Sequence, residues 1–146
     1  KNKIDSIPLG RKRRQDPMVM IVEDDRFTSA YTTSILNKTF DICHAKTGEE
    51  AISMYIEHAP DIVLLDIHLP GMDGHSTLKL LRKLDPEGFM VMLSVDASSD
   101  NVLGATEAGA QTFLKKPFSK DRLVSVIRKS PYIRMHDARM RDAARL

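Results

Sequence analysis

The sequence predicts an α/β fold in which a parallel sheet carries helices on both of its faces. Short apolar runs, each bounded by turn residues, alternate along the chain with segments of helical periodicity. The apolar runs are continuous instead of alternating with polar residues, which is typical of parallel strands buried on both faces. The crossovers between such strands are almost always right-handed.

Five strands are predicted, and each is followed by a helical segment. The strands are expected at residues 18–22, 41–45, 62–65, 89–93 and 112–114. The helices are expected at residues 26–37, after Thr47, at 76–84, at 100–108 and after Ser119. The first helix places five residues on one helical face: Phe27, Ala30, Tyr31, Ser34 and Ile35.

Several boundary residues support these helices. Asp25, Thr47 and Ser119 are predicted N-caps, because their side chains can accept a backbone N–H at a helix start. Thr47 and Glu50 have the spacing of a capping box. Gly109 suits the C-terminal end of the fourth helix, where a left-handed residue commonly follows.

The two ends of the chain differ from its middle in charge. Residues 1–16 carry six of the 22 basic and two of the 20 acidic residues, and residues 131–146 carry four and two, which leaves twelve basic and sixteen acidic residues between them. We interpret 1–16 as a basic flexible arm or linker, 17–130 as the folded domain and 131–146 as a helical tail or linker. The basic run at 11–14 could contact nucleic acid or a membrane surface, but a solvated linker is the favoured interpretation.

Several classes of protein are excluded or disfavoured. Cys43 is the single cysteine, so no disulfide forms within the chain, and we expect a reducing, cytoplasmic location. No apolar run is long enough to span a membrane, and no signal-peptide core is visible. Phosphate-binding glycine loops and zinc-protease motifs are absent, and the five histidines are scattered. The missing initiator Met suggests a segment of a longer protein.

Polar residues follow four of the five predicted strands. Glu23 and Asp24 follow the first, Asp66 the third, Ser94 the fourth and Lys116 the fifth. Because the carboxyl ends of parallel strands meet at one edge of a sheet, we expect these side chains to converge there. Three adjacent carboxylates repel one another, and a divalent cation relieves that repulsion. Oxygen ligands favour Mg²⁺, with Mn²⁺ as the alternative.

A cation, a lysine and a hydroxyl around a carboxylate favour phosphoryl chemistry. Lys116 can neutralise phosphate oxygens and Ser94 can hydrogen-bond them, so Asp66 is a candidate nucleophile that becomes an aspartyl phosphate. Each residue also has a simpler explanation: the first acids can stabilise a helix N-terminus, Ser94 can sit in a turn, and the two lysines can be solvated. Their joint placement at strand ends favours a site.

These residues carry a resemblance to a known family. Residues 18–130 resemble the receiver domain of two-component response regulators, through MIVEDD, DIVLLDIHLPGMDG, Ser94 after an apolar strand, AGAQTF and KKPF. The resemblance implies a flavodoxin-like (βα)5 fold, a doubly wound parallel sheet with strand order 2-1-3-4-5. It identifies residues 17–130 as the receiver domain.

The resemblance also implies a role for each site residue. Asp66 matches the phosphorylated aspartate, and Lys116 matches the lysine before a cis peptide bond to Pro117. Asp24 matches the direct Mg²⁺ ligand and Glu23 the ligand that acts through water. The metal set is completed by Asp66 and the backbone carbonyl of His68, and the switch pair by Ser94 and Phe113.

The implied function is that of a signalling switch and not of a metabolic enzyme. Such a domain accepts a phosphoryl group from a histidine kinase or phosphotransfer protein and catalyses its own phosphotransfer and dephosphorylation. It then changes its affinity for a downstream protein target or output domain, which allows for a homodimer. The resemblance implies neither membrane insertion nor direct nucleic-acid binding by the receiver.

Two departures and two alternatives accompany this resemblance. Val95 replaces the usual small residue beside the phosphoryl site and is expected to narrow access, and Phe113 lacks the hydroxyl of the usual Tyr. Val95 is the one feature that supports the alternative, a receiver-like docking or dimerisation module that needs no phosphorylation. A phosphatase-like hydrolase is disfavoured, because His68 stands where a second acid is needed and no cap insertion is present.

Overall fold

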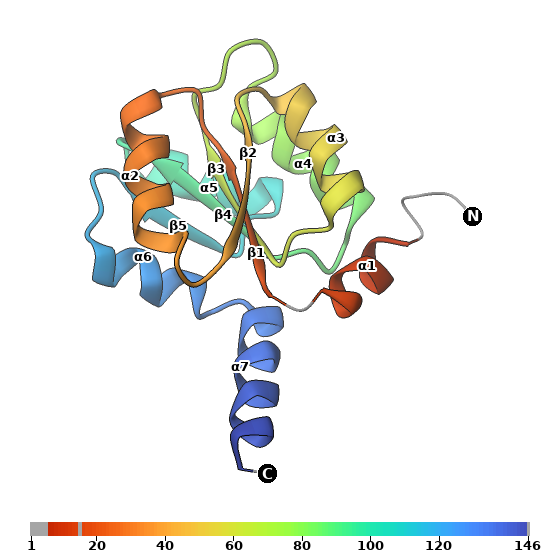
Figure 1. The fold of residues 1–146 in the computed structure, drawn as a ribbon. Helices are drawn as coiled ribbons and strands as arrows, with labels where there is room; N and C mark the ends of the chain where they lie inside the picture. Colours follow the sequence, from red (N-terminus) through yellow and green to blue (C-terminus); the bar gives the residue numbers. More distant parts are fainter. Residues whose placement is uncertain (1–5, 15, 146) are drawn as a thin grey trace.

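Five parallel strands form the central sheet of the molecule (Figure 1). The computed structural model describes residues 6–14 and 16–145. In sheet order the strands are β2 (Asp41–Ala45), β1 (Met18–Val22), β3 (Ile62–Asp66), β4 (Met90–Ser94) and β5 (Thr112–Lys115). The predicted α/β class and the strand order 2-1-3-4-5 are therefore confirmed, and the fold is flavodoxin-like.

Helices cover both faces of this sheet (Figure 1). On one face lie α3 (Gly48–His58), α4 (Gly74–Leu84) and α5 (Ser99–Ala108), and on the other α2 (Arg26–Leu36) and α6 (Lys120–Ile127). Strand β1 supplies both layers, because Met20 and Val22 point to the first face and Val19 and Ile21 to the second. This double burial explains why the strands are continuous apolar runs.

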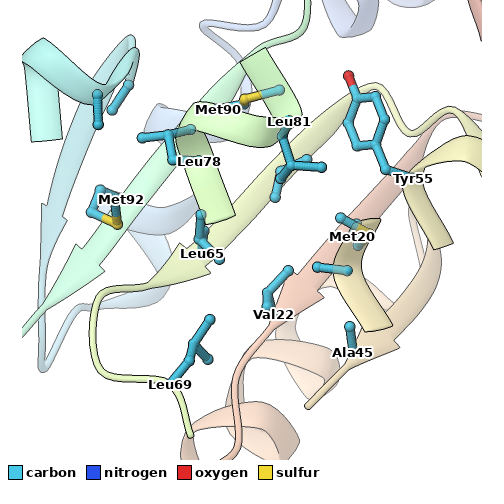
Figure 2. Close-up of a cluster of buried hydrophobic side chains, with 14 of the residues drawn as sticks. Met20, Val22, Ala45, Tyr55, Leu65, Leu69, Leu78, Leu81, Met90 and Met92 are labelled. Carbon is cyan, nitrogen blue, oxygen red and sulfur yellow. The ribbon is translucent and has the colours of Figure 1, made fainter. Parts of the chain in front are cut away.

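The larger core layer lies between the sheet and helices α3 and α4. Figure 2 shows Met20, Leu65 and Met92 of the strands facing Leu78 and Leu81 of α4. All five side chains are buried. The ring of Tyr55 from α3 closes this layer at the edge where the strands begin. The resulting core holds the opposite ends of the strands at fixed positions, which is where the polar residues lie.

The predicted caps are present at several helix starts. Asp25 accepts a hydrogen bond from the backbone N–H of Thr28 at 2.9 Å, and Thr47 accepts one from Glu50 at 3.1 Å. Helix α4 begins two residues earlier than expected, at Gly74. A Cβ at Gly74 would lie 2.4 Å from the carbonyl oxygen of Asp66, so only glycine allows α4 to start this close to the end of β3.

The flexible arm expected for residues 1–16 is wrong for the part that the structure describes. Residues Ile7–Arg13 form helix α1, and the side chains of Ile7 and Arg11 are buried. Arg11 donates hydrogen bonds to Asp85 at 2.5 Å, to the hydroxyl of Tyr55 at 3.1 Å and to a backbone carbonyl. A basic run indicates solvation. The partners of Arg11, Tyr55 and Asp85, lie far away in sequence, so the composition around Arg11 does not indicate them. Residues 1–5 and 15 lie outside the described residues.

The chain after Ser130 continues as helix α7 (Pro131–Ala144), which extends beyond the edge where the strands begin (Figure 1). Ile133 anchors it in the core on the α2 and α6 side. The ring of Tyr132 lies 4.2 Å from the guanidinium carbon of Arg11, so α1 and α7 meet through a cation–π contact. Of the helices formed by residues 6–14 and 16–145, none combines the length and apolar character needed to cross a bilayer.

Candidate functional site

The candidate site lies at the edge of the sheet where the strands end. Neighbouring strands pair Val22 with Leu65, Asp66 with Leu93, and Ser94 with Lys115. The ends of β1, β3, β4 and β5 therefore lie at one edge of the sheet, and the residues that directly follow these strands lie there too. The structure thus places Glu23, Asp24, Asp66, Ser94 and Lys116 at this edge.

Three carboxylates form the centre of the site. One carboxylate oxygen from each of Glu23, Asp24 and Asp66 lies within 4.8 Å of the others. Within residues 6–14 and 16–145, this is the one cluster of acidic, His or Cys side chains arranged to hold a metal ion. Glu23 is fully buried, Asp66 is 5% exposed and Asp24 is exposed, so the site opens to solvent on the Asp24 side.

Lys116 provides the positive charge that offsets these acids. Its ammonium group forms an ion pair with the carboxylate of Glu23 and lies 3.3 Å from Oδ1 of Asp66. The backbone N–H of Lys116 donates to the carbonyl of Ser94 at 2.8 Å, which extends the pairing of β4 and β5. The peptide bond to Pro117 is cis, as predicted. Lys115, in contrast, is exposed.

Burial and the neighbouring acid both disfavour the charged form of Glu23 in this site. The pKa of Glu23 is raised to about 7, first by burial and then by hydrogen bonding with Asp66, while Lys116 opposes the shift. A buried carboxylate with a raised pKa beside two other acids is stabilised in its charged form by a cation. Together with the all-oxygen donor set, this fits a hard divalent cation.

The remaining predicted residues surround this centre. Ser94 is fully buried, and its hydroxyl oxygen accepts the backbone N–H of Asp96 at 3.1 Å. Phe113 on β5 is half-buried against the core layer on the α3, α4 and α5 side. The side chain of His68 is exposed. The roles of Ser94 and Phe113 in a switch and of the His68 carbonyl in metal binding stay predictions.

Helix α2 does not bury the face that its apolar spacing indicates. Phe27 and Tyr31 are 86% and 46% exposed, and α2 instead buries Ser29, Thr32 and Leu36. The exposed aromatic rings border a pocket of about 360 Å³ beside the site, which is lined by Phe27, Thr28, Tyr31, Val95, Lys116, Pro117 and Phe118. Helical spacing of aromatic residues usually indicates burial, so no local signal identifies this surface.

Comparison with known proteins places the chain among two-component signalling domains. Residues 19–128 match the family model described as the response regulator receiver domain. The chemotaxis protein CheY of Bacillus subtilis is 36% identical over 114 residues, which cover 77% of this chain and 95% of that protein.

Solved structures agree with this result. The crystal structure of the CheX-CheY-BeF3-Mg²⁺ complex from Borrelia burgdorferi contains a chain that is 32% identical with a TM-score of 0.74, covering 77% of this chain and 87% of that one. The receiver domain of NtrX from Brucella abortus is 30% identical with a TM-score of 0.72, covering 77% of this chain and 96% of that one. The similarity therefore extends over the five strands and the helices between them.

Proposed function

This chain belongs to the response regulator receiver domain family, and we propose that Asp66 is its phosphoacceptor. The observation that carries the proposal is the position of the Asp66 carboxylate. It ends the central strand β3, is nearly buried, lies 3.3 Å from the ammonium of Lys116 and belongs to the acidic cluster. We propose that the receiver domain spans residues 17–130, with α1 and α7 as additions to it.

Asp24, Glu23, Asp66 and the His68 carbonyl would hold the cation, which we propose to be Mg²⁺. When bound, it neutralises phosphate oxygens. The relative from Borrelia burgdorferi was crystallised with Mg²⁺ and BeF3, which supports the choice of metal. The exposed carboxylate of Asp24 is suited to direct coordination from the solvent side, and the buried carboxylate of Glu23 suits a role deeper in the site.

The proposed reaction is phosphoryl transfer from a phosphohistidine of a histidine kinase or phosphotransfer protein. A carboxylate oxygen of Asp66 attacks phosphorus in line, the new O–P bond forms, and the N–P bond to the donor imidazole breaks. The leaving nitrogen keeps the bonding electron pair, and the donor histidine becomes a neutral imidazole after it takes a proton. Lys116 neutralises charge on the transferred group, because its ammonium already lies beside Asp66.

We propose that the aspartyl phosphate then biases a two-state equilibrium. The hydroxyl of Ser94 moves toward the phosphoryl group, and Phe113 moves inward into the space that this shift opens on β5. The changed surface alters the affinity for a downstream protein or output domain, which is a population shift between two states. Dephosphorylation at the same site resets the switch. We place this cycle in the cytoplasm, where phosphohistidine donors of this kind act.

Val95 is the one described residue that supports the alternative, a docking or dimerisation module without phosphorylation. We favour phosphorylation, because each proposed catalytic position carries a residue of the required type. Intact mass spectrometry after incubation with acetyl phosphate and Mg²⁺ tests the proposal. We expect one phosphoryl adduct, lost in Asp66→Asn and abolished by EDTA. An adduct of equal yield in Asp66→Asn would contradict the nucleophile assignment, and an adduct that forms equally in EDTA would contradict the role of the metal.

A further inference from the structure

The ring of His44 contacts the loop that carries two of the three clustered acids. This contact has no role in the phosphoryl transfer proposed for Asp66 and Lys116. We propose that His44 is a positioning residue for cation binding, which acts by fixing the peptide between Glu23 and Asp24. This inference rests on the proposed function, because it concerns the cation site of the same reaction. It adds a residue on β2, a strand that supplies none of the acids or the lysine.

The geometry of the contact is specific. The Nε2 atom of His44 lies 2.8 Å from the backbone carbonyl oxygen of Glu23 and 3.1 Å from the hydroxyl oxygen of Ser29. A carbonyl oxygen can only accept, so Nε2 carries a hydrogen and donates it to Glu23. Cys43 and Ala45, the neighbours of His44 on β2, belong to the core layer on the opposite face, so His44 points toward α2.

The backbone of the loop changes direction at this carbonyl. The N–H of Glu23 still donates to the carbonyl of Ala45 at 3.0 Å, which is the last bond between β1 and β2. The chain then leaves the sheet and enters α2 at its N-cap, Asp25. The Glu23 carbonyl belongs to the peptide that joins the two acids. A displacement of this peptide would move the backbone that carries both acidic side chains.

His44 therefore holds a backbone group that has left the sheet ladder but has not yet entered the helix. Within residues 6–14 and 16–145, it is the side chain that hydrogen-bonds the carbonyl of this peptide. The buried hydroxyl of Ser29 lies against the same nitrogen, so the ring joins β2, the acidic loop and the first turns of α2. Groups that orient metal ligands from outside commonly change metal affinity by roughly 10- to 100-fold when they are removed.

Three variants separate positioning from general stability. His44→Leu removes the donor but keeps an apolar side chain. His44→Gln places an amide N–H at nearly the same distance from the backbone as Nε2, so it keeps the donor. His44→Asn carries a shorter amide that cannot reach the carbonyl, and it replaces the leucine variant if that variant does not fold.

Isothermal titration calorimetry with Mg²⁺ on the whole chain measures the Kd, and thermal unfolding in EDTA reports the fold without metal. We expect His44→Leu to raise the Mg²⁺ Kd by about tenfold and His44→Gln to stay within about twofold of the unmodified chain, as expected for a retained donor. A purely structural role would lower the unfolding temperature in EDTA and leave the Kd unchanged.

An unchanged Mg²⁺ Kd in His44→Leu would overturn this inference, and so would a Kd in His44→Gln as high as in the leucine variant. Neither result would affect the proposed function. Absence of Mg²⁺ binding to the unmodified chain would overturn the metal assignment of the proposed function and this inference with it. The two failures are therefore distinguishable in one set of titrations.

Discussion

Replacing Arg11 with methionine is expected to destabilise the protein strongly, although the residue lies far from the candidate site. The guanidinium of Arg11 and the carboxylate of Asp85 are 2.5 Å apart, and each side chain is 4% exposed. Methionine fills much of the same volume but leaves the Asp85 carboxylate buried, with Tyr55 as its remaining side-chain partner. Removal of one member of a buried ion pair costs about 3–5 kcal/mol, because the other charge stays out of water.

The exposed pair of Arg128 and Asp137 provides a matched control. Its atoms are 3.1 Å apart, but the Arg128 side chain is 60% exposed. Arg128→Met should therefore change the free energy of unfolding by only about 0–1 kcal/mol. Urea denaturation followed by circular dichroism at neutral pH measures both variants. Equal and small losses of unfolding free energy in the two variants would show that the buried ion pair does not stabilise the packing of α1 on the domain.

Two further predictions concern acid stability and access to the site. Burial opposes ionisation of Asp85, but hydrogen bonds from Tyr55 and Arg11 outweigh it, so the pKa of Asp85 is lowered. Its contribution to stability is therefore present above the ordinary Asp pKa of about 3.9 and is lost as the pH falls through the lower folded value. Urea midpoints measured between neutral pH and acid should fall less steeply for Asp85→Asn than for the unmodified chain, and parallel curves would contradict this. Val95 is 63% exposed and lines the pocket beside Lys116. Val95→Ala should accelerate phosphorylation by acetyl phosphate severalfold in a mass-spectrometric time course, and an unchanged rate would show that Val95 does not restrict access.

The sheet and the convergence of the site could be predicted because both depend on local patterns. A continuous apolar run identifies a doubly buried strand, and the first polar residue after it marks the edge of the sheet. Asp66, at the end of β3, shows this directly, because one short segment defines both the strand and the candidate nucleophile.

The errors arose where distant partners override local pattern. Arg11 is charged and lies in a basic run, yet it is buried, because Asp85 and Tyr55 from other elements satisfy it. Phe27 has the spacing of a core residue, yet it is exposed above the site. The contact of His44 with the Glu23 carbonyl joins strand β2 to the loop after β1, and nothing in either segment alone indicates it.

The proposed switch depends on a phosphoryl group carried by Asp66. Borohydride reduction after phosphorylation tests it most directly, because hydride reduces an aspartyl phosphate to homoserine and releases phosphate. Peptide mass spectrometry then locates the reduced residue. We expect homoserine at position 66 and at no other aspartate, and only when Mg²⁺ and acetyl phosphate were both present. Homoserine at position 24, or a stable phosphoryl group on a serine or histidine, would contradict Asp66 as the phosphoacceptor.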